Sequence, residues 1–339
     1  MKILVTGGAG FIGSNFVHYW LDRHPGDELV VFDLLTYAGN RESLAAVEDR
    51  ITFVQGDICD RELAEATLRE HGTEVVVNFA AESHNSLAVV DPTRFFRTNV
   101  LGTQTLLDAS RAAGVGRFHH VSTCEVYGDL ALDTDEVFTE ESPYRPRTPY
   151  NASKAGADHA VRAYSETFGL PVSITNCSNN YGPFQFPEKV IPLFATNALD
   201  DEPLPMYAST QNKREWLHVL DHCRAVEAIV QHGRDGETYN VGSNREASIL
   251  EIADIVLDTL GKPDSLKTIV PDRPGHDRRY LLDSTKLRRE LGWKPQVEFD
   301  AGLQATVEWY AANREWWEPL LDRAPVVETA WSAGPASAR

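Results

Sequence analysis

Residues 2–13 read KILVTGGAGFIG, and the expected fold follows from this segment. A short apolar run passes into glycines with the spacing GxxGxxG, and these glycines open an amphipathic stretch. A tight glycine turn lets backbone N–H groups and the positive N-terminus of a helix approach a diphosphate without obstruction by side chains. We therefore expect a dinucleotide-binding βαβ unit with its turn at Gly7, Gly10, Phe11, Ile12 and Gly13.

A carboxylate follows at the end of the second apolar run. Asp33 lies about 20 residues beyond Gly13, the spacing at which an acidic residue accepts hydrogen bonds from an adenosine ribose. Because a carboxylate at this place would repel a 2′-phosphate, the sequence favours NAD over NADP. The other residues that we assign to the cofactor pocket are Asp57, Ile58, Ala80, Ala81 and Asn99.

Short apolar runs alternate with longer amphipathic stretches through the first half of the chain, a pattern typical of βαβ units and a buried parallel sheet. The expected strands are Lys2–Thr6, Glu28–Phe32, Ile51–Gln55, Val75–Phe79, Phe118–Ser122 and Val172–Asn176. The expected helices are Gly13–Arg23, Arg61–His71, Arg94–Ala113 and Pro149–Phe168. The pattern predicts an α/β fold: a Rossmann-type doubly wound parallel sheet with a smaller C-terminal substrate-binding lobe.

The composition of the chain changes after Asn180, where Pro and aromatic residues become frequent. A helix at Asp221–Gln231 and a strand at Thr238–Val241 indicate a return to the sheet. We predict a dinucleotide-binding domain over residues 1–180 plus about 216–242, and a substrate-binding lobe over about 181–215 and 243–322. Residues 323–339 are rich in Ala, Ser and Pro and are expected to form a flexible tail.

Composition limits the partners of the chain. The 339 residues carry 32 Lys and Arg against 50 Asp and Glu, a formal net charge of −18. Because binding of phosphodiester backbones draws on a basic excess, we expect no nucleic-acid partner. No apolar run is long enough for a span, so we expect no membrane association. The cysteines at positions 59, 124, 177 and 223 form no CxxC pair and no ligand-like spacing with His, which predicts no disulfide, no metal site and a cytoplasmic location.

Tyr150 and Lys154 lie four residues apart at the start of an expected helix, so both side chains project from one face. A Lys ammonium close to a phenol favours the phenolate, and we expect it, together with NAD⁺ in a partly desolvated cleft, to lower the pKa of Tyr150. Thr123, at the end of an expected strand, could share a substrate oxygen with Tyr150. These three residues form the candidate catalytic group.

Seven segments of the chain resemble those of a known family and occur in the family's order. They are GGAGFIGSN (7–15), NFAAESHN (78–85), STCEVYGDL (122–130), YNASKAGADH (150–159), NCSNNYGPFQFPEK (176–189), NKREWLHVLDH (212–222) and RPGHDRRY (273–280). The first and fourth are typical of the extended short-chain dehydrogenase/reductase superfamily, which includes NAD-dependent epimerases and dehydratases. The others resemble the dTDP-glucose 4,6-dehydratases, and the resemblance extends over residues 1–319.

The resemblance implies a reaction in which a hydride is borrowed and returned. In such enzymes the residue matching Tyr150 removes the proton from the sugar O4 while the C4 hydride passes to NAD⁺. Thr123 would hydrogen-bond O4, and Lys154 would bind the nicotinamide ribose. The transient 4-ketone acidifies the C5 hydrogen, which Glu125 would remove as a general base. Water then leaves from C6, and return of the hydride to C6 gives a 4-keto-6-deoxy sugar.

Cys124 departs from the family pattern, which has at this position an Asp that protonates the departing C6 hydroxyl. A thiol is mostly protonated at neutral pH and could donate that proton, although it is a weak donor. A buried Cys at a strand end can equally be a small packing residue, and packing is the role that we expect of the other three cysteines. Three outcomes stay open: dehydration with Cys124 or a water as the acid, release of a 5,6-ene sugar after return of the hydride to C4, or an inactivating substitution that holds substrate.

The resemblance also implies residues around the nucleotide diphosphate and the sugar. Arg side chains bind diphosphate oxygens through paired hydrogen bonds, and Arg214 is our first candidate for this role. The implied substrate-binding residues are Ser83, Asn180, Glu188, Lys189, Arg214, Arg273, His276 and Tyr280. The implied substrate is a nucleotide-diphospho-hexose such as dTDP-glucose. Helices 94–113 and 149–168 resemble those that pair across the two-fold axis of a homodimer.

Other functions are compatible with the fold. A nucleotide-sugar C4 epimerase would have no use for Glu125, and a decarboxylase needs a uronate substrate and a cation near C6. A non-enzymatic NAD-sensing scaffold would bind NAD without turnover, and the pair of Tyr150 and Lys154 argues against it. The sequence therefore predicts an NAD-dependent hydro-lyase, a nucleotide-sugar 4,6-dehydratase.

Overall fold

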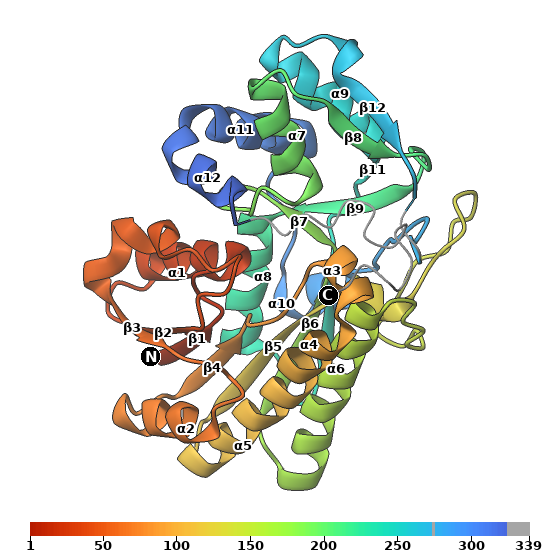
Figure 1. Cartoon of the computed structure of the whole chain (residues 1–339). Coiled ribbons are helices and arrows are strands. Elements are labelled where there is room, and N and C mark those ends of the chain that lie inside the picture. Colours follow the sequence, from red (N-terminus) through yellow and green to blue (C-terminus); the bar gives the residue numbers. More distant parts are fainter. Residues whose placement is uncertain (273–274, 324–339) are drawn as a thin grey trace.

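The computed structural model describes residues 1–272 and 275–323, and a parallel sheet of seven strands lies at its centre (Figure 1). In spatial order the strands are β10 (Thr238–Val241), β6 (Val172–Cys177), β5 (Arg117–Thr123), β4 (Val75–Asn78), β1 (Lys2–Thr6), β2 (Glu28–Asp33) and β3 (Ile51–Gln55). The order reverses direction at β1, so the chain winds outward from β1 in both directions. In sheets of this kind, ligands bind beyond the carboxyl ends of the strands at the point of reversal.

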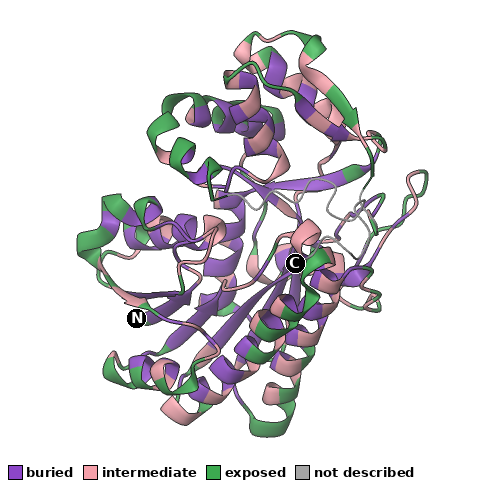
Figure 2. Ribbon diagram, in the orientation of Figure 1, coloured by how far each residue is buried: buried purple, intermediate pink, exposed green. Residues whose placement is uncertain are grey.

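Helices cover both faces of the sheet because side chains alternate along each strand. The covering helices are α1 (Phe11–Arg23), η1 (Arg41–Arg50), α2 (Arg61–Glu70), α5 (Thr103–Ala113), α6 (Pro149–Phe168) and α8 (Val219–His232). Ile3 and Val5 pack toward α1, η1 and α8, whereas Leu4, between them, packs toward α2, α5 and α6. The strands other than the edge strand β3 are accordingly buried along almost their whole length (Figure 2). The predicted doubly wound α/β fold is confirmed.

A smaller lobe lies beyond the carboxyl ends of the strands, at the top of Figure 1. Its elements are β7 (Asn179–Tyr181), α7 (Val190–Leu199), β8 (Leu204–Tyr207), β9 (Lys213–His218), β11 (Glu246–Ser248), α9 (Ile249–Leu260), η4 (Asp264–Leu266), β12 (Lys267–Val270), α11 (Phe299–Ala312) and α12 (Arg314–Leu321). The lobe has its own apolar core, which includes Phe194, Ile252, Leu303 and Trp317. The lobe therefore packs around a core of its own, above the carboxyl ends of the strands.

The predicted strands and helices agree with the structure to within two residues at their ends, except for one helix. The strand at Thr238–Val241 does return to the sheet, beside β6. The single helix expected over 94–113 is instead divided into α4 (Pro92–Phe95), a π-helical segment η2 (Phe96–Gly102) and α5. A π-helical turn takes in an extra residue and redirects side chains, which periodicity over one long window does not reveal.

The remaining elements are α3 (Asn85–Val90), η3 (Cys124–Tyr127) and α10 (Thr285–Leu291). Within residues 1–272 and 275–323, no helix combines the length and the apolar character that a membrane span requires. Of the expected tail at 323–339, all but Arg323 lies outside the described residues.

Candidate active site

A cavity of about 790 Å³ lies at the carboxyl ends of β1, β2, β4, β5 and β6, below the lobe. Most of the site residues expected from the sequence line it: Gly7, Gly10, Phe11, Ile12, Gly13, Asp33, Asp57, Ile58, Ala80, Ala81, Ser83, Thr123, Glu125, Tyr150, Lys154, Asn180, Glu188, Lys189, Arg214, His276 and Tyr280. Cys124 and Asn99 are not among the wall residues, and Arg273 lies outside the described residues. The tertiary structure thus gathers segments from the whole chain into one site.

The glycine turn forms a cradle with no room for side chains. Gly7 has a φ of +65°, and a Cβ placed on it would lie 2.6 Å from the backbone nitrogen of Ala80. A Cβ on Gly13 would collide with the carbonyl oxygen of Gly7. Helix α1 begins directly after Gly10, so its N-terminus meets the cavity through backbone alone. These are the features that a dinucleotide diphosphate requires.

Asp33 ends β2 at the rim of the cradle and is buried. Its Oδ2 accepts a hydrogen bond from the N–H of Ala9 at 2.9 Å, and its Oδ1 accepts one from the N–H of Leu35 at 2.8 Å. Burial raises the pKa of this carboxyl, and the two N–H donors oppose that rise. Asp33 is therefore held in one orientation, with its carboxylate on the cavity wall.

Asp57 and Asn99 support the wall in different ways. Burial alone would raise the pKa of Asp57, but the N–H of Cys59 and the guanidinium of Arg97 hold it below the usual value. Asn99 lies in the π-helical segment, where its amide bonds both backbone groups of Glu82 at 2.9 and 3.0 Å. Asn99 therefore stabilises the loop after β4 through hydrogen bonds and is not itself among the residues that line the cavity.

Tyr150 and Lys154 project from the first turns of α6 toward the cavity, as the four-residue spacing predicts. The Lys154 Nζ donates to the carbonyl oxygen of Val121 at 2.7 Å, and burial lowers the pKa of the ammonium. The Tyr150 hydroxyl is hydrogen-bonded to the Thr123 side chain, which opposes a rise in its pKa. Thr123, Tyr150 and Lys154 therefore meet at the end of β5.

The expected lowering of the pKa of Tyr150 includes the charge of NAD⁺ and stays a prediction; the protein groups around the phenol act in the opposite direction. Burial raises the pKa of the phenol well above its usual value, and the negative charge of Glu125 raises it further. The Lys154 ammonium is directed at a backbone carbonyl of β5. Residue spacing places the two side chains on one face but does not determine what each of them contacts.

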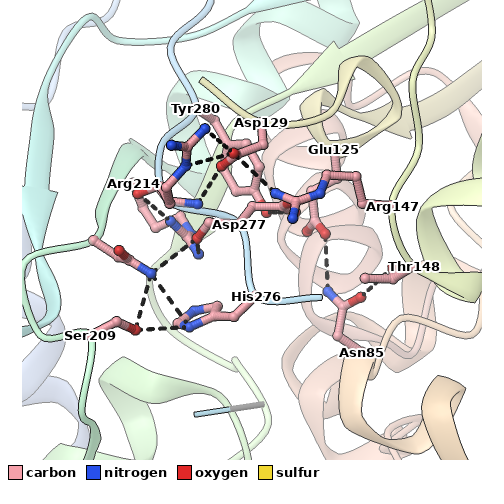
Figure 3. Close-up of polar contacts among 12 residues, drawn as sticks. Asn85, Glu125, Asp129, Arg147, Thr148, Ser209, Arg214, His276, Asp277 and Tyr280 are labelled. Atoms are coloured by element: carbon pink, nitrogen blue, oxygen red, sulfur yellow. Dashed lines mark hydrogen bonds and ion pairs between the residues drawn. The ribbon is translucent and has the colours of Figure 1, made fainter. Parts of the chain in front are cut away.

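Glu125 and Cys124 begin η3, immediately after β5. The Glu125 side chain reaches the cavity, where its Oε2 accepts a hydrogen bond from the Asn85 Nδ2 at 3.0 Å (Figure 3). Cys124 is 1% exposed and lies in an apolar cluster with Val126 and Leu282. Burial raises the pKa of its thiol well above the usual value. Of the two interpretations of Cys124, the geometry favours a packing residue over an acid.

The lobe supplies a cation on the opposite wall. Arg214 donates to the carbonyl oxygens of Lys213 and Asp277, and its guanidinium lies 4.6 Å from the centre of the Tyr280 ring. Among the described residues, Arg214 forms no ion pair with a carboxylate. A buried guanidinium held by carbonyls and an aromatic face keeps its charge available to an anion.

Several other expected substrate residues join the lobe to the loops of the first half. Glu188 accepts a hydrogen bond from the Tyr37 hydroxyl at 2.9 Å, and the Lys189 Nζ donates to the carbonyl oxygen of Ser83 at 2.9 Å. Asn180 is held by His222, whose Nδ1 lies 2.9 Å from the Asn180 Oδ1. Glu188 and Lys189 thus tie the lobe to the loops after β2 and β4, and a substrate would meet these residues as an assembled wall.

Sequence reasoning missed two features of the site. Cys177 packs in a buried apolar cluster, as predicted, but it also lines the cavity, and it pairs with Thr123 in the register of β5 and β6. Its position at the end of an expected strand was the available signal. The second feature is the pair of ion bridges from Arg147 to Asp129 and Asp277, at 3.0 and 3.1 Å (Figure 3). Three segments far apart in sequence meet there, and no local pattern indicates it.

Comparison with known proteins gives a consistent picture. A family model described as GDP-mannose 4,6 dehydratase matches residues 4–306. A dTDP-glucose 4,6-dehydratase of Streptomyces niveus is 48% identical over 326 residues, covering 94% of this chain and 96% of the relative. One of Mycobacterium tuberculosis is 49% identical over 323 residues, covering 95% of this chain and 97% of the relative.

Solved structures agree with these matches. A dTDP-glucose 4,6-dehydratase of Streptomyces venezuelae, crystallised with NAD bound, has a TM-score of 0.91 and 52% identity, covering 94% of this chain and 100% of that one. A UDP-glucose 4-epimerase of Thermotoga maritima has a TM-score of 0.86 and 30% identity, with coverage of 93% and 100%. The same fold therefore supports both dehydratases and epimerases, and the site residues must discriminate between them.

Proposed function

Since the chain belongs to the dTDP-glucose 4,6-dehydratase family, we propose that it converts dTDP-glucose to dTDP-4-keto-6-deoxyglucose with bound NAD. The observation that carries the proposal is the Glu125 carboxylate on the same cavity wall as Tyr150 and Lys154. Inversion at C4 needs no base directed at C5, whereas elimination of water across C5 and C6 does. Glu125 therefore favours a dehydratase over a C4 epimerase.

The residues present fit NAD. The backbone cradle at Gly7, Gly10 and Gly13 accommodates a diphosphate, and the buried Asp33 carboxylate suits a ribose with a free 2′-hydroxyl. Lys154 would hold the nicotinamide half. Bound there, NAD supplies a hydride acceptor at the sugar C4 that can later return the hydride.

The chain's own residues would then move protons and exclude water. Tyr150 and Thr123, already hydrogen-bonded to each other, would hold the sugar O4, and Tyr150 would take its proton. Once C4 is a ketone, the C5 hydrogen is acidic, and Glu125 would remove it as water leaves from C6. Because Cys124 faces an apolar cluster, water is favoured over its thiol as the acid for the departing hydroxyl.

The lobe would bind the nucleotide. A dTDP group carries at least two negative charges, and a chain with a net charge of −18 needs local cations to attract it. Arg214 and Lys154 are the buried cations without an ion pair among the described residues; Arg214 is the one of the two that lies in the lobe, so we assign it to the diphosphate. Asn180, Glu188, Lys189, His276 and Tyr280 would complete the wall, with Ser83 opposite.

Incubation with dTDP-glucose tests the proposal. The expected product is a 4-keto-6-deoxy sugar, detected by its alkaline absorbance, and mass spectrometry after reaction in D₂O should show solvent deuterium at C5. An unsaturated product would indicate release of a 5,6-ene sugar instead. Absence of product with dTDP-, UDP- and GDP-hexoses alike would contradict the proposed dehydratase function.

We also propose a cytoplasmic homodimer. Its support is the pair of helical segments η2 and α6, which pack together beside exposed apolar side chains at Phe96 and Leu101. The proposed division of the chain is an NAD-binding domain over residues 1–180 and about 216–242, and a nucleotide-sugar-binding lobe over about 181–215 and 243–322. A light-scattering mass of a monomer at micromolar concentration would contradict the dimer.

A further inference from the structure

Asn85 connects Glu125 to the start of the helix that carries Tyr150 and Lys154. Its Nδ2 donates to the Glu125 Oε2 at 3.0 Å, and its Oδ1 accepts from the Thr148 hydroxyl at 3.1 Å. Figure 3 shows the Asn85 side chain lying between these two residues. The three residues come from α3, from η3 and from the residue before α6, so the contact joins three separate segments.

Thr148 determines which way the Asn85 amide faces. Thr148 is the N-cap of α6, and its hydroxyl oxygen accepts a hydrogen bond from the N–H of Asn151 at 3.2 Å. The single hydroxyl hydrogen is thus left for an acceptor, which is the Asn85 Oδ1. With its oxygen facing Thr148, the amide must present its NH₂ group to Glu125.

The donor to Glu125 is neutral, and the cation beside Thr148 is engaged elsewhere. Arg147, next to Thr148 in the chain, is paired with Asp129 and Asp277. A guanidinium on Glu125 would compete with the proton that the carboxylate has to accept, whereas an amide orients the carboxylate without adding charge. The arrangement holds a base in place and leaves it able to take up a proton.

We propose that Asn85, oriented by Thr148, is a positioning residue for the general base, which ties the Glu125 carboxylate to the N-cap of α6. This inference rests on the proposed dehydratase function. Asn85 and Thr148 would fix the distance between the Glu125 carboxylate and the side chains of Tyr150 and Lys154. The reason is that the N-terminus of α6 positions both the carboxylate and this pair. Misplacement of a reacting group by about 1 Å can cost about 100-fold in rate.

Asn85→Leu tests the role of the donor, since Leu is of similar size and has no N–H in its side chain. We expect kcat with dTDP-glucose to fall by about 10- to 100-fold while KM changes by less than about twofold. With substrate deuterated at C5, the primary isotope effect on kcat should rise, because removal of the C5 hydrogen becomes more rate-limiting. Loss of folded protein alone would lower kcat and leave the isotope effect unchanged.

Thr148 supplies a second, independent pair of variants. Thr148→Ser keeps the hydroxyl and should restore both the N-cap and the isotope effect of the unaltered chain, whereas Thr148→Val should raise the isotope effect in the same direction as Asn85→Leu. The matched control is Asn197→Leu, which removes a hydrogen bond to the Pro203 carbonyl oxygen in the lobe and should leave the isotope effect as it was. Thermal unfolding and NAD binding of each variant separate misfolding from misplacement.

The possible results are distinguishable. An unchanged isotope effect in folded Asn85→Leu, or equal behaviour of Thr148→Val and Thr148→Ser, would overturn the positioning role while the dehydratase function stands. If the unaltered chain gives no 4-keto-6-deoxy sugar, the proposed function fails, and this inference fails with it.

Discussion

Cys124 and Glu125 are neighbours in the chain, yet the Glu125 carboxylate lies on the cavity wall and the Cys124 thiol lies in an apolar cluster behind it. The separation occurs within the first turn of η3, where the Thr123 hydroxyl accepts a hydrogen bond from the N–H of Glu125 at 3.2 Å. Two adjacent residues thus face different environments. A role of Glu125 in proton transfer therefore does not imply such a role for Cys124.

Cys124→Ala should therefore change stability more than turnover. Removing a buried sulfur should lower the free energy of unfolding by about 1 kcal/mol, and kcat should remain within about threefold of the unaltered chain. Thermal unfolding and product formation from dTDP-glucose measure the two effects. A loss of kcat of about 100-fold or more, with an unchanged Tm, would instead identify the thiol as a participant in the reaction.

Glu125→Gln should abolish most of the dehydration. The amide keeps the size of the side chain but cannot accept the C5 proton, and loss of a general base typically costs about 100- to 10,000-fold in rate. NAD binding should be unaffected because Glu125 lies away from the glycine turn. Undiminished formation of the 4-keto-6-deoxy product would exclude Glu125 as the base.

Gly13→Ala should weaken NAD binding. The added methyl group would collide with the Gly7 carbonyl oxygen, and forcing the turn apart should reduce affinity by about tenfold or more. Isothermal titration calorimetry with NAD measures the change. Gly26→Ala is the matched control, because no atom lies within 4 Å of a Cβ at that position. Equal affinities of the two variants would contradict a close approach of the turn to the cofactor.

Glu215 should make stability depend on pH. Burial raises the pKa of this carboxyl from 4.5 to about 7, although the N–H groups of Asn244 and Leu282 donate to it at 2.6 and 3.0 Å. A pKa raised on folding contributes stability that is fully present below the unfolded value and is lost as pH rises through the folded value. The contribution should therefore disappear between about pH 4.5 and about pH 7.

Glu215→Gln should flatten the profile of Tm against pH across that window, because Gln has no proton to lose. Its absolute Tm should be lower, since the Gln NH₂ group would face one of the two N–H donors. Unfolding by heat at half-unit pH steps gives both profiles. Parallel profiles for Glu215→Gln and the unaltered chain would show that another group titrates on unfolding.

The parts of the fold that could be predicted are those that depend on local patterns. The runs at Lys2–Thr6 and Val172–Asn176 are short and apolar with turn residues after them, so their strands needed no knowledge of partners. The π-helical segment around Asn99 is different, because its extra residue is accommodated by contacts with Glu82 and Ser153, far away in sequence. Such contacts leave no periodic trace.

For the candidate site, the spacing of glycines and of Tyr150 and Lys154 sufficed to predict two groups of residues that line the cavity, because each group lies within a single turn or a single helix. The burial of Cys124, the engagement of Lys154 with the Val121 carbonyl and the contact of Asn85 with Glu125 depended on folding in three dimensions. Dihedral angles and turn residues act over a few positions, whereas the direction of a side chain at a strand end is set by whatever distant segments pack around it.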